Sequence, residues 1–216
     1  MRMKRTLICL LAVIALWPMR PALAQTPAAE ATDDVPGEAQ ISARYLLMDA
    51  HGRAISNEDF TGRFQLVAFG FTSCPAICPS TLAAMSLVLR QLGEKAERVQ
   101  PLFVTIDPER DTPQVLDAYV RNFDERIVGL TGSPALIRRA ADNFKVTYRK
   151  YVEPGAAPGD YTMDHSVGMY LVGPDGRFLT RYPPAAPPED IAVRLAERIA
   201  AYENDPLVRR AQRGRH

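Results

Sequence analysis

The sequence predicts an α/β domain, because short apolar runs that fit buried strands alternate with segments of helical periodicity. Residues 64–71 form a continuous apolar run of the kind found in central strands, and residues 99–106 form a second one. Between these runs, apolar side chains recur at helical spacing at Leu82, Met85, Val88, Leu89 and Leu92. The chain has 216 residues, which is enough for one domain with a substantial core.

The first 24 residues are typical of a secretory signal peptide. Three basic residues precede an apolar run at 6–17, and Ala22 and Ala24 complete an Ala-x-Ala cleavage motif before Gln25. The run is shorter than the ~20 residues of a membrane span, so we expect a cleaved signal rather than an uncleaved membrane anchor. Export to the periplasm, an oxidising compartment, is therefore the predicted localisation.

Composition narrows the function classes that the mature chain can serve. Cleavage would remove four of the 26 basic residues, none of the 25 acidic residues and one of the three cysteines. The remaining chain is slightly acidic, so nucleic acid is not an expected partner. Two cysteines are too few for a disulfide-rich scaffold, which indicates that they serve chemistry or form a single local bridge.

Three further segments lie outside the alternating pattern. Residues 25–38, rich in Ala, Pro, Thr and acidic side chains, predict a flexible leader. From residue 39 onward, two strand-like stretches flank a turn at 49–52 and predict a β-hairpin. At the other end, residues 204–216 are rich in arginine and predict a frayed basic tail. The predicted domain therefore covers residues 39–203.

Turn and cap signals place the remaining elements. Thr112 and Ser133 are each followed by proline, the combination typical of an N-cap and a first helical residue. Ser80 is a suitable cap for the helix that follows the cysteines, and Gly93 ends that helix. We expect helices at 80–92, 113–123, 134–143 and 188–202, and strands at 127–130, 146–152, 168–172 and 177–181.

The order of these elements narrows the fold class. A strand leads into a cysteine pair and a helix, a second strand and helix follow, and a terminal hairpin precedes the last helix. This is the order of a thioredoxin-like three-layer α/β sandwich with an added N-terminal β-hairpin and a mid-chain insertion. Residues 146–152 alternate as an edge strand would, and a Gly/Pro-rich loop follows at 154–160.

Cys74 and Cys78 form a dithiol within the motif FGFTSCPAICP at residues 69–79. A thiolate is both a ligand for soft metals and the attacking group in disulfide exchange, so the pair suits either chemistry. The amide dipoles of a helix N-terminus would lower the thiol pKa and favour the thiolate. The sequence therefore predicts a copper site, a redox-active dithiol, or both.

The spacing of the cysteines disfavours several related roles. Thioredoxin reductants have two residues between their cysteines, whereas three residues separate Cys74 from Cys78. Peroxiredoxins place Thr or Ser three positions before the reactive cysteine, where this chain has Phe71 and Pro75. A structural disulfide here would close a very short loop and contribute less than the ~3 kcal/mol of a loop of about 15 residues.

A metal ion would need a further ligand, and the chain has three histidines. His51 lies in the predicted hairpin turn and His216 ends the basic tail, so both are expected to be exposed. His165 precedes the strand at 168–172, where a thioredoxin-like topology brings a loop over the thiols. Two thiolates suit Cu(I), and one added imidazole gives a three-coordinate site that also accepts Cu(II). We therefore expect His165 to lie near the dithiol.

Asp107 is a further candidate, because it ends the strand at 99–106 and should reach the same edge of the sheet as the dithiol. A carboxylate at that edge could orient His165 or contact a partner. A turn and a helix cap would equally explain Asp107 and Asp111, so the structural and the functional explanation both stay open.

Three motifs together resemble those of the Sco/SenC/PrrC family of copper chaperones, which are linked to cytochrome c oxidase assembly. The motifs are the dithiol segment at 69–79, TIDPERDTP at 105–113 and DHS at 164–166, in that order. The resemblance implies that Cys74, Cys78 and His165 bind one copper ion. It also implies delivery of that ion to the dinuclear copper site of oxidase subunit II.

The resemblance implies partners and one alternative function. An upstream periplasmic copper donor would load the site, and the acceptor would be subunit II or another copper protein. Many family members keep an N-terminal membrane anchor, whereas this chain is predicted to carry a cleavable signal, so a different acceptor stays open. Some relatives act as thiol-disulfide reductants. The alternative is therefore a periplasmic oxidoreductase in which Cys74 and Cys78 form the catalytic dithiol, and only in that case would the protein be an enzyme.

Overall fold

The computed structural model describes residues 40–157 and 159–213. The predicted signal peptide, the predicted leader and His216 lie outside the described residues. None of the described helices is both long enough and apolar enough to cross a lipid bilayer.

A five-stranded mixed sheet, in the order β5-β4-β3-β8-β9, forms the centre of the domain. Strands β3 (Phe64–Gly70), β4 (Val99–Thr105) and β5 (Val128–Leu130) run parallel to one another. Strands β8 (Met169–Val172) and β9 (Phe178–Tyr182) continue the sheet in antiparallel pairing. Every residue of β3 and β4 is buried, which explains why both appear in the sequence as continuous apolar runs.

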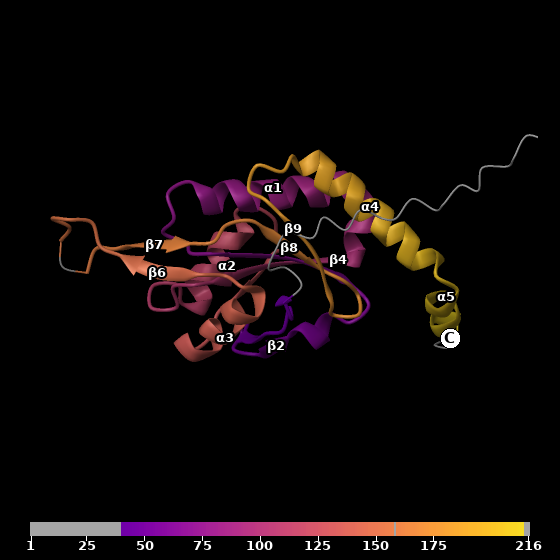
Figure 1. Cartoon of the computed structure of the whole chain (residues 1–216), viewed down its shortest axis with the longest axis horizontal. Helices are drawn as coiled ribbons and strands as arrows, with labels where there is room; N and C mark the ends of the chain where they lie inside the picture. Colours follow the sequence, from indigo (N-terminus) through magenta and orange to yellow (C-terminus); the bar gives the residue numbers. More distant parts are fainter. Residues whose placement is uncertain (1–39, 158, 214–216) are drawn as a thin grey trace, which may run out of the picture. The chain divides into compact units, whose positions relative to one another are not determined.

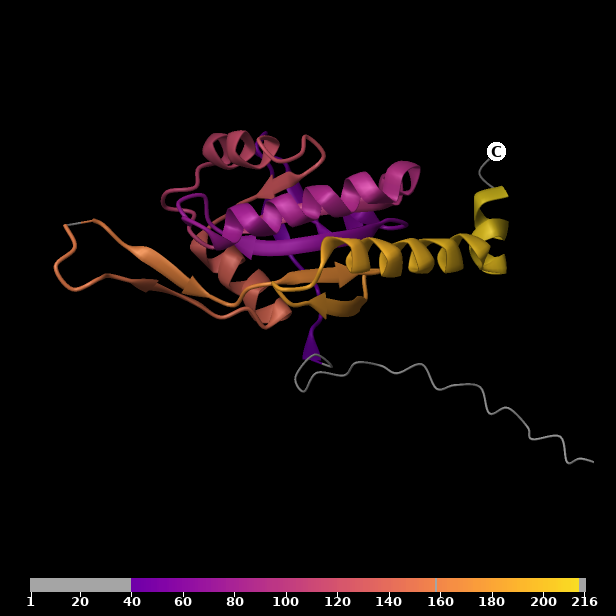
Figure 2. The same cartoon turned by 90° about the horizontal axis from the view of Figure 1, so that it is seen from above.

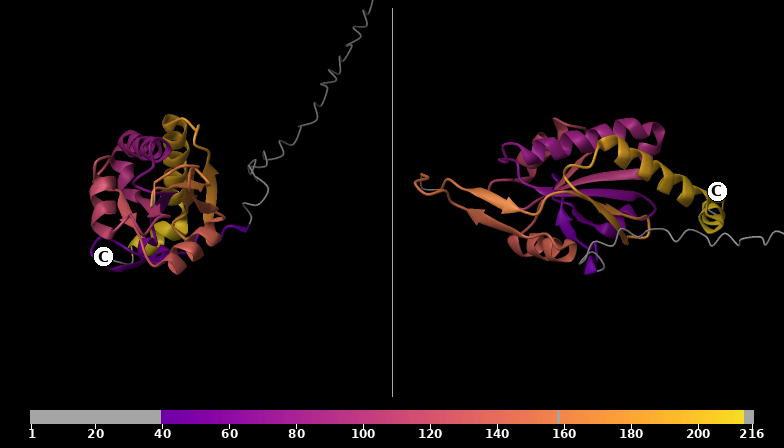
Figure 3. Two further views of the ribbon diagram at one scale, coloured as in Figure 1. Left: turned by 90° about the vertical axis from the view of Figure 1, so that its left-hand side faces the viewer. Right: turned by 45° about the horizontal axis from the view of Figure 1, so that its top comes forward.

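Helices cover both faces of this sheet, as Figures 1 and 3 show. Helix α1 (Ile77–Leu92) and helix α4 (Pro188–Asn204) pack side by side on one face. Helix α3 (Pro134–Phe144) lies on the opposite face, and helix α2 (Pro113–Arg121) packs beside β5 at the sheet edge. The predicted layered α/β arrangement is therefore present in the described residues.

The caps of α2 and α3 are those expected from the sequence. Thr112 accepts a hydrogen bond from the backbone N–H of Val115, and Ser133 accepts one from that of Leu136. The start of α1 is different, because Ala76 rather than Ser80 is its N-cap. Proline is tolerated in a first helical turn, where its missing N–H has no partner to lose, so Pro79 does not delay the helix. Cys78 is consequently the second residue of α1.

The C-terminal segment is more regular than expected. Helix α4 ends at Asn204, and a further helix, α5 (Pro206–Arg213), begins almost at once. The Asp205 carboxylate accepts a hydrogen bond from the backbone N–H of Leu207 at 2.8 Å, and Pro206 stands at the start of the helix. These two start signals account for a helix where the arginine-rich composition predicted a frayed tail.

Two hairpins lie outside the central sheet. Strands β1 (Leu46–Met48) and β2 (Ala54–Ser56) pair across the predicted turn, and a 3-10 helix at Asn57–Phe60 follows them. Strand β6 (Tyr148–Tyr151) pairs with β7 (Thr162–His165) in a separate two-stranded sheet, so residues 146–152 are not an edge of the main sheet. Figures 1 and 2 show the β6–β7 hairpin projecting beyond the ends of the central strands.

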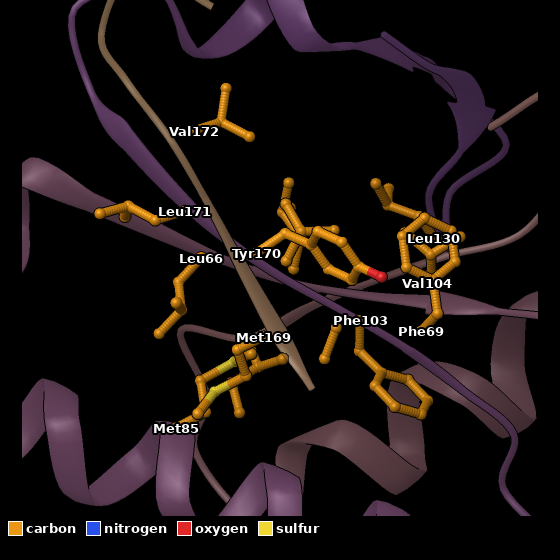
Figure 4. Close-up of a cluster of buried hydrophobic side chains, with 14 of the residues drawn as sticks. Leu66, Phe69, Met85, Phe103, Val104, Leu130, Met169, Tyr170, Leu171 and Val172 are labelled. Carbon is orange, nitrogen blue, oxygen red and sulfur yellow. The ribbon is translucent and has the colours of Figure 1, made fainter. Parts of the chain in front are cut away.

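Aromatic and aliphatic side chains fill both sides of the sheet, as Figure 4 shows for the strands β3, β4 and β8. Phe69 and Tyr170 lie on the α3 side, where both rings contact Phe144, at centroid distances of 5.2 and 5.4 Å. Met85 of α1 and Met169 of β8 are buried in the same core. A second 3-10 helix, Gly93–Arg98, links α1 to β4. Strand β3 and the start of the dithiol loop therefore pack directly against the hydrophobic core.

Candidate metal centre

The dithiol lies where β3 passes into α1. Both cysteines are free thiols; Cys78 is 2% exposed, and Cys74 is half-buried. The backbone N–H of Cys78 points at the Cys74 sulfur, at 3.4 Å. The junction of β3 and α1 therefore holds one thiol in the core and the other near the surface.

The two thiols differ in acidity. Burial opposes ionisation of Cys74, but the backbone N–H groups of Cys78, Ala76 and Ile77 and the Cys78 thiol together hold the pKa of Cys74 below its usual value. Burial raises the pKa of Cys78 well above its usual value, and the nearby charges of Cys74 and Asp111 add to this effect. Cys74 is therefore the thiol that ionises first and the more reactive nucleophile.

Gly70, the last residue of β3, makes room for the buried thiol. A Cβ atom at this position would lie 2.6 Å from the Cys78 sulfur and 2.7 Å from the Phe103 ring. Neither neighbour can withdraw without disturbing the core, so glycine is the residue that the site requires here. The place of the Cys78 sulfur is thus specified by the packing of β3 and β4.

His165 ends strand β7 and reaches the dithiol from the hairpin. Its Nε2 atom lies 4.0 Å from the Cys78 sulfur, and its Nδ1 atom lies 2.7 Å from the carbonyl oxygen of Ser166. A carbonyl can only accept, so Nδ1 carries the proton and the Nε2 lone pair faces the thiol. The edge of the Phe71 ring packs against the imidazole, with ring centroids 5.9 Å apart.

The imidazole is set up as a neutral donor. Burial lowers the pKa of His165, and the Ser166 carbonyl and the Asp164 charge offset only part of this effect. Neutral imidazole is the form that binds metals, and the carbonyl at Nδ1 holds the ring in one tautomer. These are the features expected of a histidine ligand.

The three predicted ligands are neighbours, but they do not form a closed cage. Within the described part of the chain, no group of three or more His, Cys, Asp or Glu side chains is arranged as a ready-made metal site. His165 is next to Cys78, whereas the Cys74 sulfur is engaged by the amides at the start of α1. Two sulfurs and one imidazole nitrogen are nevertheless a donor set that suits copper. His51 is exposed in the turn between β1 and β2, and it is not one of the neighbours of the dithiol.

Asp107 is buried next to the site but does not contact His165 among the hydrogen bonds of the described residues. Its Oδ2 atom accepts from Nε of Arg110 at 2.5 Å, and its Oδ1 atom accepts from the Tyr161 hydroxyl at 2.8 Å. The Ser166 carbonyl takes the orienting role that the sequence suggested for Asp107. Asp107 therefore connects the loop after β4 to the hairpin that carries His165.

Arg110 and Tyr161 complete this connection, and the sequence alone did not reveal either residue. The Arg110 guanidinium stacks on the Tyr161 ring, 3.8 Å from its centroid, and its Nη1 atom donates to the Tyr161 carbonyl at 2.9 Å. We call Asp107, Arg110 and Tyr161 the hairpin anchor. An ion pair between Lys150 and Glu109, at 2.6 Å, joins the same two segments at the surface. TIDPERDTP contains two of the three anchor residues, but no periodicity links them to Tyr161.

The chain is similar in sequence to a known protein family. A model of the SCO1/SenC family matches residues 33–200. The mitochondrial SCO2 homolog of Bos taurus is 40% identical over 162 residues, which are 74% of this chain and 60% of that protein. The chain therefore spans about three-fifths of the length of this curated relative.

Solved structures show the same fold. Bradyrhizobium japonicum ScoI, solved with copper bound, is 38% identical with a TM-score of 0.66, covering 73% of this chain and 98% of that one. BsSco, described as a Sco-family cytochrome c oxidase assembly protein with a disulfide switch, is 28% identical with a TM-score of 0.56 over 73% of this chain and 92% of that one. These similarities confirm the predicted thioredoxin-like α/β class.

Proposed function

Because the chain belongs to the SCO1/SenC family, we propose that it is an exported metallochaperone that delivers copper to the dinuclear copper site of cytochrome c oxidase subunit II or to another copper enzyme. The observation that carries this proposal is the 4.0 Å approach of the His165 Nε2 atom to the Cys78 sulfur. It joins an imidazole from one segment to a dithiol from another, 87 residues apart.

Cys74, Cys78 and His165 would hold the copper ion as cargo. Two thiolates provide the soft donors that Cu(I) prefers, and the neutral imidazole extends the site to Cu(II). The Ser166 carbonyl keeps the Nε2 lone pair of His165 directed at the dithiol. The packing around Gly70 keeps the Cys78 sulfur in place at the same time.

Transfer to an acceptor requires that one ligand be reachable by the partner's thiolates. Cys74 lies next to exposed residues, and Ile77 at the start of α1 leaves 46% of its surface exposed. An acceptor thiolate would replace Cys74 first and the buried Cys78 last, so the ion would pass by stepwise ligand exchange. The apolar surface around Cys74 supports docking of a protein partner at this point.

The difference between the two thiols favours a second candidate function, a thiol-disulfide oxidoreductase that reduces the cysteines of the copper-site target. The Cys74 thiolate would attack a partner disulfide, forming a mixed disulfide and releasing one partner thiolate. Cys78 would then lose its proton and attack Cys74, releasing the second partner thiolate. The partner gains two electrons, and Cys74 and Cys78 end as a disulfide.

The periplasm is the proposed place of action, with an upstream copper donor and a copper enzyme as partners. The support is the N-terminal segment, in which a basic stretch, an apolar run and an Ala-x-Ala motif follow in order. Mass analysis of the protein recovered from the periplasmic fraction would find the chain starting at Gln25. A chain that keeps residues 1–24 would contradict cleavage.

The copper proposal is tested by anaerobic titration of the reduced protein with Cu(I) in competition with a chelator. We expect one tightly bound equivalent, weakened by about 10- to 100-fold or more in His165→Ala, because outer partners alone contribute that range in metal sites. His51→Ala is the matched control, since it removes an exposed imidazole and should change nothing. If the wild-type protein failed to compete for Cu(I), the oxidoreductase would become the better explanation.

A further inference from the structure

A fully buried carboxylate lies beside the dithiol loop and takes no part in the site described above. Asp111 is 0% exposed, between β4 and α2. Its Oδ1 atom accepts from the Thr72 hydroxyl at 2.5 Å, and its Oδ2 atom accepts from the Thr72 backbone N–H at 3.1 Å and from the Thr105 hydroxyl at 2.6 Å. Thr72 is two residues from Cys74. Asp111 therefore ties the dithiol loop to the end of β4.

Asp111 is the acceptor in all three hydrogen bonds. The Thr105 hydroxyl oxygen already accepts from the Asp107 backbone N–H at 2.9 Å, so its proton is free to point at Asp111. A carboxyl group that only accepts is in its ionised form. The described part of the chain offers Asp111 no ion pair, because its donors are two hydroxyls and one amide. The site thus contains one buried negative charge without a cationic partner.

We propose that Asp111 is a positioning residue for the dithiol loop, and that its uncompensated charge makes the copper site favour Cu(II) relative to Cu(I). This inference rests on the proposed copper-binding function and adds a determinant of the oxidation state that the site prefers. Asp111 accepts two hydrogen bonds from Thr72, which is two residues from Cys74, so its charge lies next to the dithiol loop.

The ratio of the Cu(II) and Cu(I) dissociation constants does not depend on the protons that the ligands release on binding. With the same three ligands, the Cu(II) complex carries one more positive charge than the Cu(I) complex. Any protons released on binding are the same in both cases and cancel in the ratio of the two dissociation constants. A fixed negative charge nearby stabilises the more positive complex more strongly. Through the partly screened interior of a protein, one such charge changes the ratio by about tenfold.

Asparagine is the substitution that separates charge from shape. In Asp111→Asn the amide oxygen can keep the bonds from Thr105 and from the Thr72 N–H, and the amide NH2 can donate to the Thr72 hydroxyl. The side chain is then close to isosteric and fully hydrogen-bonded. Thr72→Val does the reverse, because it removes one hydrogen bond from the loop and leaves the carboxylate charge in place.

The experiment measures the dissociation constants for Cu(I) and for Cu(II) by chelator competition in wild type, Asp111→Asn and Thr72→Val. Asp117→Asn is the control, since it removes the same charge from a partly exposed site paired with Arg121. In Asp111→Asn we expect the ratio of dissociation constants, Cu(II) over Cu(I), to rise about tenfold. Asp117→Asn should leave the ratio unchanged. Thr72→Val should weaken the binding of Cu(I) and of Cu(II) by the same factor.

An unchanged ratio in folded Asp111→Asn protein would overturn the inference and leave Asp111 as a structural carboxylate. Failure of this isosteric variant to fold, judged by circular dichroism, would overturn it in the same way. Wild-type protein that binds neither ion would instead refute the proposed function.

Discussion

The dithiol and His165 reach the same place from two regions that are held in different ways. The dithiol continues directly from β3, a strand that pairs along its full length with β4 and is entirely buried. His165 belongs to the β6–β7 hairpin, which pairs only with itself and is held to the domain by side chains. The cysteines are therefore positioned by the core, whereas the histidine depends on the hairpin anchor.

This difference is consistent with the proposed function, in which the protein binds an ion and then releases it. Local opening costs least where buried apolar contacts are few and backbone pairing with the core is absent. The β6–β7 hairpin meets that description, since Met163 is the one buried residue of its two strands, so we expect it to open more readily than the strands that support the dithiol. Substitutions at the dithiol and substitutions in the hairpin should therefore differ in their effects on copper affinity and on cysteine reactivity.

The largest effect is expected on the dithiol side. Cys78→Ser removes one of the two proposed sulfur ligands and should weaken Cu(I) binding by more than the ~100-fold that outer partners of a metal ligand contribute. The fold should survive, because serine has nearly the same size and shape as cysteine at this site, which is 2% exposed. Chelator competition and circular dichroism measure the two effects. Wild-type affinity in Cys78→Ser would remove this sulfur from the ligand set.

The two thiols should also differ strongly from each other in the protein without copper. The pKa of Cys74 lies below its usual value, so its thiolate persists to lower pH than that of a free cysteine, and protonation stops its reaction only below that range. The pKa of Cys78 is raised, so it should stay protonated and unreactive across neutral pH. Alkylation followed by peptide mass analysis over a pH series tests this. Equal modification of both thiols would contradict it.

On the histidine side, breaking the hairpin anchor should have a smaller and more selective effect. Arg110→Ala removes the stack on Tyr161 and the bonds to Asp107 and the Tyr161 carbonyl. We expect Cu(I) affinity to fall by about tenfold, the lower end of the effect of outer partners, with Cys74 alkylation unchanged. Arg121→Ala is the matched control, because Arg121 forms a surface ion pair with Asp117. Equal losses in both variants would show that the anchor has no special role.

The smallest effect is expected from Tyr161→Phe. This change deletes the hydroxyl that donates to Asp107 at 2.8 Å and keeps the ring on which Arg110 stacks. A hydrogen bond to a charged group contributes about 1.5–3 kcal/mol at most, and only the part felt by His165 would reach the copper affinity. We expect a loss of less than tenfold, with faster amide exchange in β7. A loss larger than that of Arg110→Ala would reverse the order of importance within the anchor.

The sequence predicted those parts of the molecule that depend on local signals. The apolar runs of β3 and β4 and the Thr112 and Ser133 caps were recognisable because burial and capping leave a local pattern. The start of α1 was placed too late, because Pro79 resembles a break although a first turn tolerates it. Strand β7 was missed, since TMDH has neither an apolar run nor a clear alternation.

The remaining features depend on contacts between distant residues. Tyr161 lies 51 residues from Arg110, and Thr72 lies 39 residues from Asp111. No periodicity in the chain connects either pair, so only the folded arrangement shows that one holds the hairpin and the other holds the dithiol loop. The approach of His165 to Cys78 was predictable only because the order of elements indicated a thioredoxin-like topology.

X-ray absorption at the copper edge of the Cu(I)-loaded protein tests most directly whether the two regions supply one site. We expect two sulfur neighbours and one nitrogen neighbour in the wild type, and two sulfurs without that nitrogen in His165→Ala. A wild-type spectrum with fewer than two sulfurs, or a nitrogen that persists in His165→Ala, would contradict a copper site built from the core dithiol and the hairpin histidine.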